Sequence, residues 1–508
     1  MGIKKGVFIA FWVLFFLSTI NFDINIYDEG VALVGALNVI NGKKPYIDFW
    51  TMYSPGWFYL LAGWIMLFGK QILAIRILTL IINTFNLFLF FYILKKGIKA
   101  SNVSFIILLC LIAFYSINPF YARNVPFSIS IYLLSFFLLL SDMRWKYFLL
   151  GLCAGFFFLI RHDFAIYFAL WVFSSLFVQF LLDKNKLRFI NIIVFACVFF
   201  CFVSIFSLLL SSTGMLQGFI QDAILFPITH FGATRSLPFP NPFSFVFDLN
   251  LSIVSKFYKL WETTIFYLPW SLLILSCVLF FYKRKSSVKF EYYDLFAIGG
   301  VLFLSFQGVI RSDLEHIFPS LVFGLLLLGK FLERYLESKK IALVLILVFF
   351  VVPPFFKKVQ SIFLLYNSRK SIELASINGN NIKIPSTNSY YNDLLNFIST
   401  SFGNKLFFSG LNRHDRIYTN DVILYYLVDK LPPTKYYELH PGLATNESIQ
   451  KKIIDELIEK KIEWLVIYDN QVYENQNYIG SDTLDKFFST NYKIFKKFGR
   501  YSIYKIRS

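Results

Sequence analysis

The chain has 508 residues, of which 57% are hydrophobic and only 16% charged, and its mean hydropathy is +0.59. A soluble domain of ordinary composition has about 25% charged residues, so the composition excludes that class and indicates a polytopic membrane protein. A net charge of +18 could also indicate a nucleic-acid-binding protein. The positions of the basic residues argue against a nucleic-acid partner.

Apolar stretches of about 17–25 residues are typical of membrane-spanning helices. The first has a basic start, like a signal peptide, but no small-residue cleavage site before Asp28, so we expect a retained anchor. The expected spans, about eleven in number, lie near residues 6–22, 71–94, 103–118, 125–141, 147–160, 164–182, 189–211, 264–282, 292–310, 317–332 and 341–356.

The basic clusters of the first 357 residues all fall on one side of these spans. Cytoplasmic loops of membrane proteins are rich in Lys and Arg, so this side is expected to be the cytoplasm, with the N-terminus inside. The positive charge is therefore mainly a topology signal in a cytoplasmic-membrane protein, and no nucleic-acid partner is expected. The clusters are Lys4-Lys5, Lys95-Lys96-Lys99, Arg144-Lys146, Lys184-Lys186-Arg188, Lys283-Arg284-Lys285-Lys289 and Arg334-Lys339-Lys340.

The same topology places three clusters of ionisable residues together on the outer face. They are Asp28-Glu29, Arg161-His162-Asp163 and the run from Arg311 to His316. The long loop 212–263 and everything after about residue 357 lie on this face too. We therefore expect the functional site on the outer side of the membrane.

The chain is predicted to fall into two parts. Residues 1–357 form the membrane domain, which Pro353-Pro354 is expected to close. Residues 385–508 mix helical and strand patterns: residues 394–398 and 449–460 favour helices, and 405–408 and 464–468 favour short strands. This alternation predicts a C-terminal extracytoplasmic α/β domain.

The acidic pair Asp28-Glu29 is the leading candidate for catalysis. Adjacent carboxylates at the membrane boundary are costly unless water, a cation or a reacting group uses them. They could act as acid and base on an acceptor hydroxyl or hold a divalent cation. Alternatively, Asp28 could cap the helix that contains Val31 to Val39, and the spacing does not decide between these interpretations. Asp48 adds a further carboxylate in the same loop.

The other two clusters suit the binding of an anion. Arg161 and Asp163 could contact a substrate or simply form a mutually satisfied pair. Arg311 and His316 could bind a phosphate at the membrane boundary, because Arg offers a bidentate fork and His a titratable donor. A purely structural role for this third cluster remains open.

The first outer loop resembles that of a known family. The run Asp28-Glu29-Gly30, Gly42, Pro45-Tyr46-Ile47-Asp48-Phe49 and Tyr53-Ser54-Pro55-Gly56 is similar to the first external loop of bacterial GT-C glycosyltransferases, in the branch related to protein O-mannosyltransferases and lipid A aminoarabinose transferases. The resemblance covers nearly the whole chain. Further similar patterns are Arg161-His162-Asp163-Phe164, Arg311-Ser312-Asp313 with Glu315-His316, Pro433-Thr434-Lys435-Tyr436-Tyr437 and His440-Pro441-Gly442.

The resemblance implies an inverting sugar transfer from a polyprenyl-phosphate-linked donor to a lipid, glycan or protein acceptor outside the cytoplasmic membrane. It implies that Asp28 is the general base and that Glu29 supports it or binds a ligand. Some relatives use a divalent cation, such as Mg²⁺ or Mn²⁺, and others do not. Where the aminoarabinose branch has a lysine-containing stretch, this chain has Tyr53-Ser54-Pro55-Gly56, which leaves donor-phosphate binding to residues elsewhere. Arg311 is the expected one, and Arg161 or Arg311 would neutralise the leaving phosphate. The expected substrate-binding residues are Asp48, Tyr53, Arg161, His162, Asp163, Arg311, Asp313 and His316.

A transporter or flippase of lipid-linked sugars is the alternative function. Such a protein should have charged or Gly/Pro-broken helices near the middle of the membrane, and often an internal repeat. Neither feature is evident in the sequence, so the transferase is favoured.

Overall fold

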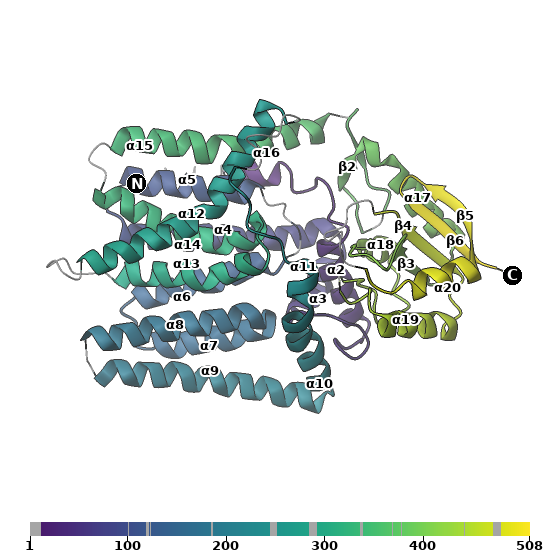
Figure 1. Cartoon of the computed structure of the whole chain (residues 1–508), viewed down its shortest axis with the longest axis horizontal. Helices are drawn as coiled ribbons and strands as arrows, with labels where there is room; N and C mark the ends of the chain where they lie inside the picture. Colours follow the sequence, from purple (N-terminus) through teal and green to yellow (C-terminus); the bar gives the residue numbers. More distant parts are fainter. Residues whose placement is uncertain are drawn as a thin grey trace.

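The computed structural model describes residues 12–507, with gaps at 100, 118–120, 122, 184–185, 244–250, 284–291, 336–338, 368, 377, 441 and 471–478. Lys4-Lys5, Lys184, the run from Arg284 to Lys289 and Pro441 therefore lie outside the described residues. The described chain forms a bundle of long helices and a mixed α/β unit, which occupy opposite ends of the molecule (Figure 1).

Long apolar helices build the bundle, and the predicted polytopic helical fold is confirmed. Seven helices of the described chain are long and apolar enough to cross a membrane, and every predicted span from residue 71 onward coincides with a helix. Together with shorter apolar helices they make up the bundle, whose elements are α4 (Ile72–Gly97), α5 (Ser101–Ile117), α6 (Val125–Leu140), α7 (Lys146–Ile160), α8 (His162–Asp183), α9 (Lys186–Ser212), α12 (Ile253–Lys283), α13 (Tyr292–Ile310), α14 (Leu314–Tyr335) and the final pair α15 (Lys339–Ile346) and α16 (Val352–Tyr366).

The expectation that Pro353-Pro354 closes the last span is wrong. Helix α15 continues through a π-helical segment, η3 (Leu347–Val351), directly into α16. The two prolines lie in the first turn of α16, where a missing backbone N–H breaks no bond of that helix. The helix therefore runs to Tyr366, and the domain limits 1–357 and 385–508 stay predictions.

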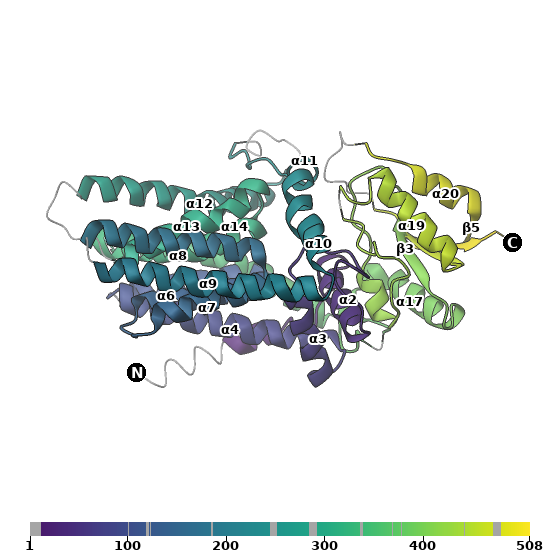
Figure 2. The same ribbon diagram turned by 90° about the horizontal axis from the view of Figure 1, so that it is seen from below.

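Short helices lie between the bundle and the α/β unit in both views (Figures 1 and 2). Two of them come from the N-terminal part of the chain and carry the acidic pair and the Tyr53 loop. The others belong to the long loop that follows α9. They are α2 (Asp28–Ile40), α3 (Gly56–Phe68), α10 (Leu216–Gly218), η1 (Phe219–Leu225), η2 (Pro227–Phe231) and α11 (Gly232–Arg235).

The C-terminal unit has the expected strand–helix–strand pattern. Strands β3 (Phe407–Leu411) and β4 (Trp464–Tyr468) pair in parallel, which requires a crossover connection, and α19 (Glu447–Glu459) lies within it. The sheet order is β3-β4-β6-β5, with β5 (Tyr492–Phe498) and β6 (Tyr501–Ile506) antiparallel. The remaining elements are β1 (Ser371–Glu373), β2 (Lys383–Pro385), η4 (Ser386–Asn388), α17 (Ser389–Ser401), α18 (Ile423–Leu427) and α20 (Thr483–Asn491).

The α/β unit docks directly on the segment that carries the acidic pair. The backbone N–H groups of Val422 and Ile423 donate to the carbonyl of Ile26, at 2.9 and 3.0 Å. A Cβ atom on Gly30 would lie 2.4 Å from the backbone nitrogen of Ile423, so only glycine allows α2 and α18 to approach this closely. The acidic pair is therefore positioned by both units of the protein.

Candidate functional site

A cavity of about 150 Å³ lies where α2 meets the ends of several bundle helices. Its lining combines apolar side chains with a small number of charged ones, as is typical of ligand sites. The charged lining residues are Asp28, Arg123, Arg161 and Glu315, with His316 beside them. Apolar lining residues include Val31, Ala32, Ile129 and Phe318.

Asp28 is the first residue of α2, and its side chain is 40% exposed. It does not cap the helix. Asn25 does so instead, because its Oδ1 accepts hydrogen bonds from the backbone nitrogens of Tyr27 and Asp28, at 3.0 and 2.8 Å. The capping alternative for Asp28 is therefore wrong, and the carboxylate faces the cavity.

Glu29 lies on a different side of α2 and does not line the cavity. Consecutive residues of a helix point in different directions. Glu29 forms a bidentate ion pair with Arg76 of α4, at 2.9 and 2.8 Å, and both side chains are 1% exposed. The prediction that Glu29 works beside Asp28 in catalysis is not supported by this geometry, which gives Glu29 a structural role.

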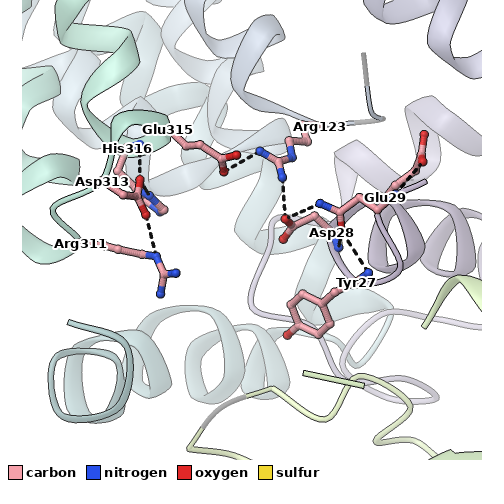
Figure 3. A network of polar contacts seen from close by, with 9 residues as sticks. Tyr27, Asp28, Glu29, Arg123, Arg311, Asp313, Glu315 and His316 are labelled. Atoms are coloured by element: carbon pink, nitrogen blue, oxygen red, sulfur yellow. Dashed lines mark hydrogen bonds and ion pairs between the residues drawn. The ribbon is translucent and has the colours of Figure 1, made fainter. Parts of the chain in front are cut away.

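Arg123 connects two carboxylates of the cavity. Its Nη2 donates to Oδ2 of Asp28 and its Nη1 to Oε2 of Glu315, each at 2.7 Å. Figure 3 shows the guanidinium of Arg123 between the two acids. Asn25 Nδ2 also donates to Oδ2 of Asp28, at 3.1 Å. Oδ1 of Asp28 accepts no hydrogen bond from the described residues.

Arg161 adds a second guanidinium to the cavity wall. Its Nη1 donates to Asn124 at 2.9 Å and its Nε to Asp163 at 3.1 Å, and its guanidinium lies 4.1 Å from the ring centre of Phe164. Asp163 also accepts from Gln307 at 2.9 Å. The Arg161–Asp163 pair predicted from the sequence thus exists, and Arg161 still reaches the cavity.

No protein-family model matches the chain, and no curated protein matches it. Solved structures do match it along nearly its whole length. ArnT from Cupriavidus metallidurans bound to undecaprenyl phosphate has a TM-score of 0.59 at 12% identity, over 99% of this chain and 98% of that one. The apo state of ArnT gives the same TM-score at 11% identity, over 99% and 97%.

The chain has the fold of ArnT. The GT-C-like fold expected from the resemblance is therefore confirmed.

Within the ArnT fold, two of the expected binding residues have structural roles instead. His162 is buried; its Nδ1 bonds Ser54 Oγ at 2.9 Å and its Nε2 bonds the carbonyl of Ala223 at 2.8 Å. It ties the Tyr53 loop to η1. Asp48 is exposed and accepts from the backbone nitrogen of Lys44 at 2.6 Å, so it closes a local turn. Neither residue lines the cavity.

Only part of the third cluster, the run from Arg311 to His316, lines the cavity. His316 lines the cavity, and its Nδ1 bonds Asp313 at 2.7 Å. Burial opposes ionisation of Asp313, but the hydrogen bonds and charge of His316, with the charge of Arg311, outweigh it and lower its pKa to about 2. Arg311 donates to Asp313 at 2.9 Å and to the carbonyl of Arg235. Arg311 is not among the lining residues of the cavity, whereas Arg123 is.

Tyr53 lines the cavity as expected. Burial and the nearby charge of Glu438 raise its pKa to about 12, so it stays neutral and serves as a polar wall. Its neighbour Tyr27 donates to Oε1 of Glu438 at 2.9 Å. Glu438 is contributed by the C-terminal unit and is 1% exposed, which shows that this unit reaches the edge of the cavity.

The geometry of the acidic pair does not suit the binding of a divalent cation. Asp28 and Glu29 diverge, and Glu29 already binds Arg76 with both oxygens. Among the described residues there is no group of three or more His, Cys, Asp or Glu side chains that could hold a metal. The acidic pair therefore does not form a divalent-cation site in this geometry.

Sequence reasoning missed Arg76, Arg123 and Glu438. Arg76 is a lone charge within the predicted span 71–94, a position at which a charged residue needs a partner. Arg123 is a single basic residue between two predicted spans, on the same predicted side as Arg161 and Arg311, and no motif marks it. Glu438 lies between the two tail patterns and has no local signal that links it to Tyr27, 411 residues away.

Burial gives Glu438 a pH-dependent effect on stability. Desolvation raises the pKa of Glu438 to about 8, whereas an exposed Glu has a pKa of about 4.3. The folded state therefore binds the proton of Glu438 more tightly than the unfolded state does, and proton binding stabilises the fold. This stabilisation is complete below about pH 4 and is lost as the pH rises to about 8. Between these two pH values the free energy of unfolding falls by at most about 1.4 kcal/mol per pH unit.

We expect Glu438→Gln to flatten this dependence. The wild-type unfolding temperature in detergent should fall between pH 5 and pH 8 relative to the Gln variant. Thermal unfolding of both proteins at several pH values measures this, with the exposed Glu447→Gln as the control. Parallel curves for Glu438→Gln and the wild type would contradict the prediction.

Proposed function

We propose that the protein is an integral membrane glycosyltransferase of the GT-C type that moves a sugar from a polyprenyl-phosphate-linked donor to a hydroxyl of an acceptor outside the cytoplasmic membrane. The observation that carries the proposal is one cavity that holds the Asp28 carboxylate and the guanidinium groups of Arg123 and Arg161, in a chain with the fold of ArnT. That ArnT structure was solved with undecaprenyl phosphate bound.

The lining of the cavity supports a lipid-phosphate donor. Apolar side chains such as Val31, Ile129 and Phe318 continue from the bundle to the charged groups. A polyprenyl chain would stay among lipids and apolar helices, while its phosphate would reach Arg123 and Arg161. We propose accordingly that the N-terminus faces the cytoplasm and the C-terminal unit the outside.

Asp28 is proposed as the general base. The acceptor hydroxyl transfers its proton to Oδ1 of Asp28 as its oxygen forms a bond with the anomeric carbon. On the opposite face of that carbon, its bond to the phosphate oxygen breaks and the phosphate leaves as an anion. The configuration at the anomeric carbon is thereby inverted. Arg123 and Arg161 neutralise the charge that develops on this oxygen.

The phosphate can displace Glu315 from Arg123. Glu315 is 49% exposed, and ion pairs of exposed groups contribute only about 0–1 kcal/mol. Arg123 could then keep Asp28 on one nitrogen and bind the phosphate with the other. This exchange would hold the base and the leaving group on one guanidinium.

Two substitutions with opposite expected effects test the exchange. Arg123→Gln should weaken undecaprenyl phosphate binding about 10- to 100-fold, because hydrogen bonds to charged groups contribute about 1.5–3 kcal/mol. Glu315→Gln should strengthen binding, since it removes a competing carboxylate. Binding is measured by titration of the detergent-purified protein.

Arg144→Gln is the control for this pair. Arg144 is an exposed arginine just before α7, on the side that we predict to face the cytoplasm, so its loss should leave binding unchanged. Equal affinity for Glu315→Gln and wild type would contradict the exchange, and normal binding by Arg123→Gln would remove Arg123 from the phosphate site.

The proposed function itself is tested with the protein in liposomes and a panel of undecaprenyl-phosphate-linked sugars. Release of undecaprenyl phosphate, followed by mass spectrometry, supports the transferase. Mass analysis of envelope glycans and lipids from cells with and without the protein then identifies the sugar and the acceptor. Movement of the donor across the bilayer without its cleavage would favour the transporter alternative.

A further inference from the structure

A second cavity lies on the other side of the segment that carries Asp28. Its volume is about 510 Å³, within the range of about 300–1,000 Å³ that small-molecule sites have. One wall is the segment from Asp23 to Ile26, and the others come from β2, η4, the start of α17 and the adjacent ends of β4 and β6. The bundle is joined to the C-terminal unit at this point.

Four tyrosines form the wall of this cavity: Tyr390, Tyr391, Tyr468 and Tyr501. Tyr501 is central, with ring centres 5.0 Å from Tyr468, 5.6 Å from Tyr391 and 6.3 Å from Tyr390. Tyr391 and Tyr501 are only 4% and 3% exposed, whereas Tyr390 and Tyr468 are half-buried. The flat apolar faces and polar edges that Tyr390 and Tyr468 leave open suit stacking against a ring-shaped ligand.

Two of these rings are fixed from behind by a buried acid. The hydroxyls of Tyr391 and Tyr501 both donate to Oδ2 of Asp421, at 2.9 and 2.8 Å. Asp421 is fully buried, so these rings are held rigidly before any ligand arrives. A preformed wall loses less conformational entropy on binding than a flexible one.

The polar groups of the cavity are balanced in charge. Its lining contains one carboxylate, Asp23, and one guanidinium, Arg500, together with the amide of Asn388 and the hydroxyl of Thr387. A site for a phosphate or nucleotide would carry an excess of basic groups, which these residues do not supply. Rigid aromatic faces with uncharged and oppositely charged polar groups match a saccharide, whose rings have C–H faces and hydroxyl edges.

The position of the cavity relates it to Asp28. The segment from Asp23 to Ile26 lines the second cavity, and Tyr27 and Asp28 line the first. Asp28 lies five positions after Asp23, so their Cα atoms are at most about 18 Å apart. Arg76 fixes the segment between them, because it donates to the carbonyl of Asp23 at 2.7 Å and to Glu29. A glycan of several sugar units that extends from the second cavity past this segment would reach the base.

We propose that the second cavity binds a saccharide, the glycan part of the acceptor. The role as acceptor site rests on the proposed function, whereas saccharide binding does not require it. The ligand class follows from the tyrosine wall and the balanced charge, and the acceptor role from the shared segment that lies between the two cavities.

Binding of free oligosaccharides to the full chain in detergent tests the proposal. The probes are di- to tetrasaccharides of neutral hexoses, N-acetylhexosamines and uronic acids, measured by calorimetry or saturation-transfer NMR without any lipid-linked donor. At least one class should bind. Arg500→Ala, which removes a polar group, and Thr387→Trp, which fills the space, should each weaken that binding about tenfold or more.

The variants keep the fold because Thr387 and Arg500 are exposed, and thermal unfolding verifies this. Lys493→Ala is the matched control: it removes one exposed positive charge from β5, outside the cavity, and should bind saccharide like the wild type. Undecaprenyl phosphate binding should be unchanged in all three variants.

Two outcomes overturn the proposal: no saccharide of the panel binds, or Arg500→Ala and Thr387→Trp bind saccharide as well as Lys493→Ala does. Saccharide binding without donor cleavage would support the saccharide site and contradict the proposed transferase activity. Donor cleavage without saccharide binding would support the transferase activity and contradict the saccharide site.

Discussion

Replacing Asp28 with asparagine is expected to reduce sugar transfer about 10²- to 10⁴-fold, the range that general acid–base catalysis contributes. Asparagine has nearly the same shape and can still accept hydrogen bonds from Asn25 and Arg123, which both contact Oδ2 in the wild type. It cannot take a proton from the acceptor. The loss should therefore appear in the rate of transfer, while undecaprenyl phosphate binding is retained.

The control is a second acid from the same loop. Asp48 is exposed and accepts a hydrogen bond from the backbone of Lys44, which asparagine can preserve. Asp48→Asn should therefore leave transfer close to that of the wild type. Single-turnover kinetics with saturating donor measure both variants. If Asp28→Asn transferred sugar at the wild-type rate, Asp28 could not be the base, and the proposed mechanism would have to be abandoned.

Breaking the Glu29–Arg76 pair is expected to give the largest loss of stability. Removal of one partner of a buried ion pair costs about 3–5 kcal/mol, because the other charge remains buried. Arg76 contributes more than this pair, since it also donates to the carbonyls of Ile20 and Asp23, at 2.9 and 2.7 Å. Arg76→Ala should thus destabilise both the pair and the segment that leads to Asp28.

Thermal unfolding of the purified protein measures this effect. Lys70→Ala is the control. Lys70, just before α4, also forms an ion pair, with Asp429, but this pair is exposed: its side chains are 40% and 48% exposed. Its loss should cost about 1 kcal/mol or less. The double variant Glu29→Leu/Arg76→Leu should recover part of the loss, since no unpaired charge remains. Equal unfolding temperatures for Arg76→Ala and Lys70→Ala would show that the buried pair is not important.

Much of the fold could be predicted from local patterns. Apolar stretches located the long helices from α4 onward, and the strand pattern at 464–468 coincides with β4. The one clear error in the last span came from Pro353-Pro354, which lie in the first turn of α16 and do not end the span. Proline disrupts a helix interior but is tolerated in the first turn, and the sequence alone did not show where that turn was.

The candidate site was predicted less completely. Asp28, Tyr53, Arg161 and His316 do line one cavity, as their positions on the outer face suggested. Glu29, Asp48 and His162 are close to them in sequence but bind other parts of the protein. Which residue of a loop or helix start faces a cavity depends on the rotation of the backbone there, and composition and spacing do not determine that rotation.

The sequence by itself determined the membrane class and the approximate spans, and it grouped Asp28, Arg161 and His316 on one side of the helices. These properties follow from local hydropathy and charge, which act on each segment separately. Only the tertiary structure decided that Arg123 holds Asp28, that Arg76 removes Glu29 from the cavity, and that Glu438 of the C-terminal unit contacts Tyr27. These are contacts between segments far apart in the chain, and their geometry is set by how the helices and the α/β unit pack together.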